Sequence, residues 1–232
     1  MMCGVSETAF SQMIAYIDQR ANHAKGAADA DPFSQGLEVA RVEAEENGVS
    51  LPSPTVGTLL TTLAAAGARA DAAQGAVAVT PAAGTVGLHL LRGLPEKSTL
   101  TCIEPEAALQ SGTKAAVRAA GYAPSRVRFL TARPLDVMGR LANDAYQVIY
   151  ADVSPVELGA IIDAAWPLLT PGGTLVLAGS LLDGTVADAT RRDRETAAAR
   201  EADDYAETFA AEHGGVVTRL PLDGGLTLVT KR

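Results

Sequence analysis

Residues 76–91 read AVAVTPAAGTVGLHLL, an apolar run followed by a turn of small residues and then a helical pattern. A buried strand that turns directly into a helix is the first unit of many α/β sheets, and nucleotide-like ligands often bind at that turn. A dinucleotide-binding turn reads G-x-G-x-x-G, but the glycines here are Gly84 and Gly87, and Pro81 has no N–H to face a phosphate. The turn therefore predicts a ligand without phosphates.

The chain beyond this unit alternates short apolar runs with helical patterns. We expect strands at residues 76–80, 99–103, 127–131, 148–151 and 174–178. We expect helices near residues 85–93, 106–120, 134–142 and 156–169, and a polar helix with charges all round near 186–212. This alternation is typical of a parallel sheet. The ending GGVVTRLPLDGGLTLVTKR predicts an antiparallel hairpin at one edge of that sheet, for seven strands in all.

A long helical region precedes the first strand. Apolar residues at helical spacing predict helices over residues 6–22, 33–47 and about 55–68, with Ser6 and Glu7 as cap residues of the first. A chain of 232 residues fits one structural unit, which we divide into a helical extension over residues 1–50 and an α/β domain over 51–232.

Composition excludes several classes of function. The formal net charge is −8 and only 4% of residues are aromatic, so we expect no nucleic-acid partner. The sequence holds no apolar run of the roughly 18 residues that a membrane span needs, and we expect no membrane partner. The two cysteines, Cys3 and Cys102, support neither a disulfide framework nor a cysteine-rich metal site, which favours a cytoplasmic protein.

An acidic residue follows the second predicted strand. In LTCIEPE, residues 100–106, Glu104 comes about twenty residues after the turn. A carboxylate at that position accepts hydrogen bonds from two ribose hydroxyls, so a small-residue turn plus Glu104 indicates an adenosine-bearing ligand. The alternative is that Glu104 is a solvated loop residue or a helix cap, because Pro105 suits the start of a helix.

Further motifs share an order and a spacing. They are VGTLLTTLAAA, TLTCIEPE, KAAVRAAGYAPSRVRFL, YQVIYADVSP, LLTPGGTLVLAG, LLDGTV and LPLDGGLTLVTKR. From about Pro52 to the C-terminus, the chain resembles the S-adenosylmethionine-dependent O-methyltransferases related to catechol and caffeoyl-CoA O-methyltransferases. The resemblance implies a Rossmann-like class I methyltransferase fold, S-adenosylmethionine as cofactor, a small hydroxylated substrate and a homodimer.

The resemblance also places the cofactor, with several altered positions. The family pattern E-I-G-x-x-x-G-x-S falls on Ala78, Thr80, Gly84 and Val86, where only the second glycine remains. Thr80 and backbone carbonyls could partly replace the missing carboxylate. The positions near the adenine read TARP, residues 131–134. The candidate cofactor-binding residues are Thr80, Pro81, Ala82, Gly84, Val86, Glu104, Pro105, Ala132, Arg133, Asp152 and Ser154.

The resemblance makes Asp152 the candidate catalytic residue. Metal-dependent relatives hold a divalent ion with this acid and with an Asp-Asn pair after the fifth strand. Here that pair is Ala178-Gly179, and a lysine that often serves as the base is replaced by Pro155. One carboxylate is too few for a hard cation, so we predict no metal site. We expect Asp152 to orient a substrate hydroxyl or to accept its proton directly.

Two alternatives for Asp152 stay open. It could bind a metal if Asp183 or Glu157 turned inward. It could instead cap the following helix, for which Ser154 suits the N-cap and Pro155 the first helical position.

The sequence leaves three functions in competition. The first is an active O-methyltransferase. The second is a relative that binds S-adenosylmethionine or S-adenosylhomocysteine without turnover, as a sensor or dimeric scaffold. The third keeps the fold for interaction alone. Glu104, Gly84 and Asp152 favour the first two, whereas the altered positions favour the last two.

Overall fold

The computed structural model describes residues 8–26, 31–67 and 75–232. The strands are β1 (Gly75–Val79), β2 (Leu100–Ile103), β3 (Val127–Leu130), β4 (Tyr146–Ala151), β5 (Leu169–Leu177), β6 (Gly215–Leu220) and β7 (Leu226–Lys231). The α-helices are α1 (Ala9–Gly26), α2 (Pro32–Glu46), α3 (Pro54–Ala66), α4 (Ala83–Gly93), α5 (Ala107–Ala119), α6 (Pro134–Val137), α7 (Leu158–Ala165) and α8 (Arg194–His213).

The strands form one seven-stranded sheet in the order β3-β2-β1-β4-β5-β7-β6. β1 to β5 are parallel, whereas β7 pairs antiparallel with β5 and with β6. The parallel sheet and the C-terminal hairpin are therefore confirmed. The strand order reverses between β1 and β4, so the turn after β1 lies where open α/β sheets bind ligands.

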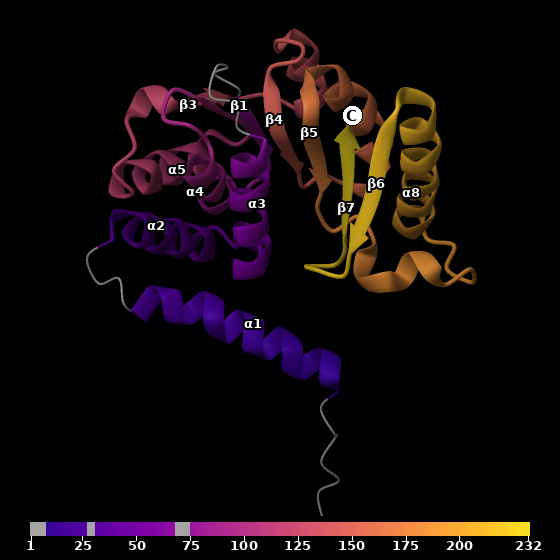
Figure 1. Ribbon diagram of the computed structural model, residues 1–232, viewed down its shortest axis with the longest axis horizontal. Helices are drawn as coiled ribbons and strands as arrows, with labels where there is room; N and C mark the ends of the chain where they lie inside the picture. Colours follow the sequence, from indigo (N-terminus) through magenta and orange to yellow (C-terminus); the bar gives the residue numbers. More distant parts are fainter. Residues whose placement is uncertain (1–7, 27–30, 68–74) are drawn as a thin grey trace, which may run out of the picture.

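Alternating side chains of the central strands enter two separate cores. Ala76 and Ala78 of β1 lie in the core beneath α3, α4 and α5, whereas Val77 and Val79 lie in the core beneath α7 and α8. Both faces of the sheet are thus covered by helices, as Figure 1 shows. This arrangement explains why the residues of β1, β2 and β4 are all buried.

The N-terminal helices add a further layer. α2 packs against α4 and α5, and α3 packs against α4. Ser53 caps α3 by accepting a hydrogen bond from the N–H of Val56, and Pro54 follows it at the first helical position. α1 meets α3 and runs beneath α2 and α3 in Figure 1, past the end of the sheet where the β6–β7 turn lies.

Some predicted boundaries were wrong. The helix predicted near residues 186–212 begins at Arg194, where Asp193 caps it, and residues 182–187 form a separate short 3-10 segment. This helix, α8, also buries a stripe that includes Ala199, Ala206 and Phe209, so its charges do not surround it. β5 begins at Leu169 rather than at 174. The helices predicted over 134–142 and 156–169 are each divided into shorter α and 3-10 pieces. The predicted caps Ser6 and Glu7 lie outside the described residues.

Candidate active site

The carboxyl ends of β1, β4 and β5 are held together by backbone hydrogen bonds. The N–H of Asp152 donates to the carbonyl of Val79 at 2.8 Å, and the N–H of Ala178 donates to the carbonyl of Ala151 at 2.9 Å. These bonds continue the ladder one residue beyond each strand. They fix the turn after β1 next to Asp152.

The hydroxyl of Thr80 connects this turn to Asp152. Thr80 is 2% exposed, and its Oγ1 accepts a hydrogen bond from the N–H of Ala82 at 3.1 Å. The same hydroxyl donates to Oδ2 of Asp152 at 3.3 Å. The predicted site residues Thr80, Ala82 and Asp152 are therefore brought together. Pro81 lies between them and is exposed at the tip of the turn.

The start of α4 is buried by the N-terminal helices. A Cβ atom at Gly84 would lie 3.1 Å from the Cβ of Ala40 in α2, so the glycine permits close helix packing. Val86 is fully buried in the core beneath these helices. The hydroxyl of Thr85 is buried and has no hydrogen-bond partner in the described chain, but it borders a cavity of about 20 Å³. That volume holds one water molecule, which can bind the hydroxyl.

Glu104 is 7% exposed at the end of β2. Its Oε1 accepts a hydrogen bond from the N–H of Glu106 at 2.8 Å, which leaves Oε2 to accept from a ligand. Burial raises the pKa of Glu104 above its ordinary value, the bond from Glu106 N–H opposes that rise, and the Glu106 charge adds to it. Because α5 begins only at Ala107, with no side-chain capping bond, Glu104 and the exposed Pro105 lie in the loop before it.

A polar pair lies beside Glu104 toward β3. Nε2 of Gln110 donates to the backbone carbonyl of Glu104 at 3.1 Å and to Oγ1 of Thr131 at 2.8 Å. Ala132 follows half-buried, and Arg133 is exposed at the N-cap position of α6 without a side-chain capping bond. The residues predicted to lie near the adenine thus follow β3, next to Glu104.

Asp152 retains an exposed surface at this edge, but it is enclosed enough that lost solvation raises the pKa of its carboxyl. The hydrogen bond from Thr80 lowers the pKa and only partly offsets this. A carboxylate with a raised pKa is a better proton acceptor than an ordinary surface aspartate. Ser154 stands at the N-cap position of a 3-10 turn that begins at Pro155, but its hydroxyl makes no capping bond, so the predicted cap is wrong in that respect.

Residues with positive φ gather around the same edge. Asp183 (φ 53°) donates its N–H to the carbonyl of Gly224 at 3.1 Å, and Asp223 has φ 46°. Oδ2 of Asp223 accepts a hydrogen bond from the N–H of Ser53 at 2.6 Å, which ties the β6–β7 turn to the start of α3. Strained backbone of this kind is often found at binding sites.

The sequence reasoning missed Tyr150, which is 3% exposed in β4. Its phenol pKa is raised well above its usual range, first by burial and then by the charges of Asp152 and Asp223. The sequence shows only that a tyrosine lies in the apolar run of β4, two residues before the candidate base, and such a residue reads as ordinary core.

The donor set around Asp152 does not fit a resident metal ion. Ala178 and Gly179 supply no side-chain ligand, and across residues 8–26, 31–67 and 75–232 no group of three histidine, cysteine or acidic residues is placed to hold one. We therefore derive no chemistry through a metal.

The sequence matches curated relatives over most of its length. A predicted O-methyltransferase of Mycolicibacterium vanbaalenii is 36% identical over 205 residues, which cover 88% of this chain and 86% of that protein. The chain belongs to this O-methyltransferase family. Another family member, from Mycobacteroides abscessus, is 31% identical over 215 residues, covering 93% of this chain and 95% of that protein. No family model matches the chain.

Solved structures share the fold. A crystal structure of a protein from Corynebacterium glutamicum is 51% identical, with a TM-score of 0.85 and 97% of each chain covered. An O-methyltransferase from Bacillus cereus, solved in complex with S-adenosylhomocysteine, is 21% identical with a TM-score of 0.76, covering 94% of this chain and 97% of that one. The second likeness shows the fold alone. These structures confirm the Rossmann-like methyltransferase architecture.

Proposed function

We propose that this chain transfers the methyl group of S-adenosylmethionine to a hydroxyl group of a small molecule. The observation that carries the proposal is Glu104, a buried carboxylate at the end of β2 with one oxygen left free for a ligand. A ribose supplies the two hydroxyl donors that this position accepts in adenosine-binding α/β folds. The residues present therefore fit the cofactor.

The cofactor residues follow the carboxyl edge of the sheet. Glu104 would hold the ribose, and Gln110 with Thr131 would face the adenine side. The turn at Thr80 would face the methionine part. When bound, S-adenosylmethionine supplies an electrophilic methyl group on a sulfonium. What the protein supplies is the position of the acceptor oxygen, since alignment of reacting atoms lowers the barrier substantially.

Asp152 would act on the acceptor hydroxyl. Its raised pKa suits proton acceptance, and the Thr80 hydroxyl binds one carboxylate oxygen, which leaves the other to accept the proton of the acceptor hydroxyl. With Ala178 and Gly179 beside it, the proposed reaction is independent of a tightly bound metal.

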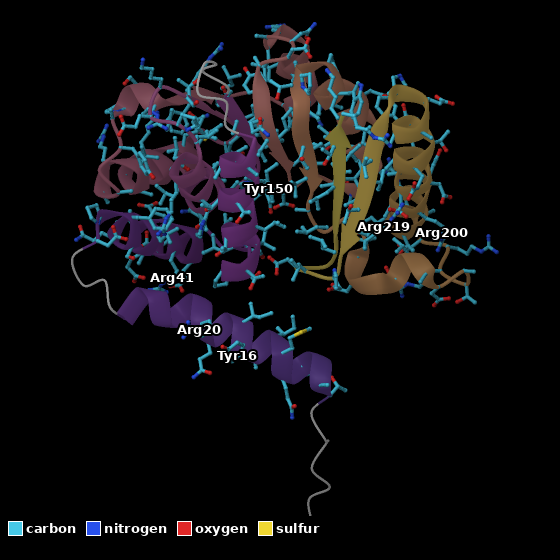
Figure 2. The ribbon with its side chains drawn as sticks, viewed as in Figure 1. Tyr16, Arg20, Arg41, Tyr150, Arg200 and Arg219 are labelled. Atoms are coloured by element: carbon cyan, nitrogen blue, oxygen red, sulfur yellow. The ribbon has the colours of Figure 1, made fainter. Side chains whose placement is uncertain are left out.

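The assembly state is also a proposal. Met13 and Tyr16 of α1 are 50% and 62% exposed, and a second copy of the chain could cover them in a homodimer. Figure 2 shows Tyr16 and Arg20 on α1, which lies at the margin of the molecule and contacts α3. Among the described residues, no helix is long and apolar enough to cross a membrane. We keep a cytoplasmic location and the lack of a nucleic-acid partner as proposals from composition.

The test is incubation with S-adenosylmethionine and a panel of phenols, catechols and hydroxy acids, with mass-spectrometric detection of S-adenosylhomocysteine and the methylated product. We expect turnover on at least one hydroxylated compound, and less of it in Asp152→Asn. Cofactor binding without any turnover would favour the sensor or scaffold alternative, to which the residues Ala178 and Gly179 already point.

A further inference from the structure

Tyr150 combines a buried ring with an unused hydroxyl. The residue is 3% exposed, yet its hydroxyl makes no hydrogen bond with any part of the chain that the structure describes. The hydroxyl oxygen itself keeps some contact with solvent, because the fully buried side-chain atoms without a partner in the described chain are those of Thr85 and Ser98. A ligand that binds at this edge can replace that solvent as the hydrogen-bond partner.

The surroundings of Tyr150 place it at the ligand-binding edge. Its register partner in β1 is Ala78, a small residue on the same face of the sheet and one residue before the end of β1. Asp152 and Asp223 are both close enough for their charges to act on the phenol. Figure 2 shows Tyr150 in the interior of the molecule, whereas Arg41 lies on α2 and Arg200 and Arg219 lie by α8. The labelled arginines thus lie away from Tyr150 and the ligand-binding edge.

Charge fixes the direction in which the cofactor would lie. Glu104 ends β2, and β4 is two strands away from it, a separation of about 10 Å. The neutral side chains of Gln110 and Thr131 lie on the β3 side of Glu104, where they suit the uncharged adenine of the cofactor. On the β4 side stand Asp152 and Asp223, which suit a cation. The amino-acid end of the cofactor carries both an ammonium and a carboxylate group, and of these two the ammonium is the one that acidic side chains attract.

We propose that the Tyr150 hydroxyl oxygen and the free carboxylate oxygen of Asp223 accept hydrogen bonds from that ammonium group. The inference rests on the proposed function. Oδ2 of Asp223 is occupied by the Ser53 N–H, which orients the carboxylate and leaves Oδ1 for the ligand. The phenol stays protonated at neutral pH, so its lone pairs are available and its own O–H can bind Asp152 or a water. Tyr150 and Asp223 would thus bind the ammonium in place of a side chain at position 78, where Ala78 has no polar group.

Calorimetric titration with two ligands tests the assignment. S-adenosylhomocysteine carries the amino-acid group, and methylthioadenosine lacks it. We expect Tyr150→Phe and Asp223→Asn each to weaken S-adenosylhomocysteine binding roughly fivefold to tenfold, as loss of one hydrogen bond does, and to leave methylthioadenosine within about twofold. Asn at 223 keeps an oxygen for the Ser53 N–H. Tyr146→Phe, a buried tyrosine at the other end of β4, is the matched control and should change neither affinity.

Each other outcome overturns the assignment. If Tyr150→Phe weakens both ligands equally, Tyr150 acts through the fold or the adenosine part. If it weakens neither, the hydroxyl has no part in binding. A wild-type protein that binds neither ligand would instead remove the proposed function, and the ammonium site with it. A thermal unfolding scan of each variant shows whether a lost affinity reflects a lost fold.

Discussion

Glu104→Gln is the substitution that most directly separates a ribose-binding acid from a loop residue. The glutamine keeps a side-chain oxygen for the N–H of Glu106 and is cheaper to bury than a carboxylate, so the fold should remain intact. Removing the charge weakens the hydrogen bonds from the ribose hydroxyls by about 2 kcal/mol in total, which is roughly a thirtyfold rise in the Kd for S-adenosylhomocysteine. Isothermal calorimetry measures this directly.

Glu106→Gln is the matched control, since it removes the same charge from an exposed neighbour and should leave the Kd within about twofold. Equal affinities for wild type and Glu104→Gln would refute the ribose assignment.

The pH dependence of cofactor binding gives a second check. Because burial raises the Glu104 pKa, the free carboxyl takes up a proton at a higher pH than an ordinary glutamate, and wild-type affinity should fall as pH drops through that raised pKa. The glutamine variant should lose this dependence. The same shift makes the contribution of Glu104 to the free energy of unfolding decrease as pH rises from its unfolded to its folded pKa.

Three further predictions follow from the same structure. Asp152→Asn should leave the affinity for S-adenosylhomocysteine within about threefold. It should lower kcat by about 100-fold or more, since a positioned base contributes roughly that factor. An unchanged kcat would show that Asp152 has only a structural role. Pre-treatment with EDTA should leave methyl transfer unchanged, and restoration of lost activity by added Mg²⁺ would contradict the metal-independent site. Gly36→Ala should lower the free energy of unfolding by about 1–3 kcal/mol, because its new Cβ would lie 2.5 Å from the Cβ of Ala120 and 2.7 Å from the carbonyl oxygen of Ala116. Gly139→Ala, which meets nothing within 4 Å, is the control for denaturant unfolding; equal stability of the two variants would show that α2 does not pack as described.

The sheet was predictable because its strands carry local signals. β1 is a fully apolar run bounded by a turn, and the C-terminal hairpin has Pro and Gly between two alternating segments. Glu104 and Asp152 could be placed from sequence for the same reason, since each directly follows a strand in a parallel sheet.

The remaining features depend on side-chain orientations and contacts that the sequence pattern does not give. Residues 186–193 have helical composition, but the helix starts at Arg194 because Asp193 accepts a hydrogen bond from the N–H of Thr196. Ser154 has the right position for a cap, but the cap bond depends on a side-chain orientation that sequence does not give. Asp223 reaches this edge through its bond to Ser53, 170 residues earlier.

Tyr150 shows the same limit at the site itself. Its strand was predicted correctly, and a tyrosine within it reads as ordinary core. Only the fold reveals that its hydroxyl has no partner in the described chain and that two carboxylates act on it.

The central claim is that the edge formed by the turn after β1, Glu104 and Asp152 binds S-adenosylmethionine. The most direct measurement is calorimetric titration of the purified wild-type protein with S-adenosylmethionine and with S-adenosylhomocysteine, each with and without Mg²⁺. The account predicts a single site with micromolar affinity, a binding free energy of about −8 kcal/mol, and no change on adding Mg²⁺. No heat of binding at millimolar ligand would contradict it and would show that the fold is kept for another purpose.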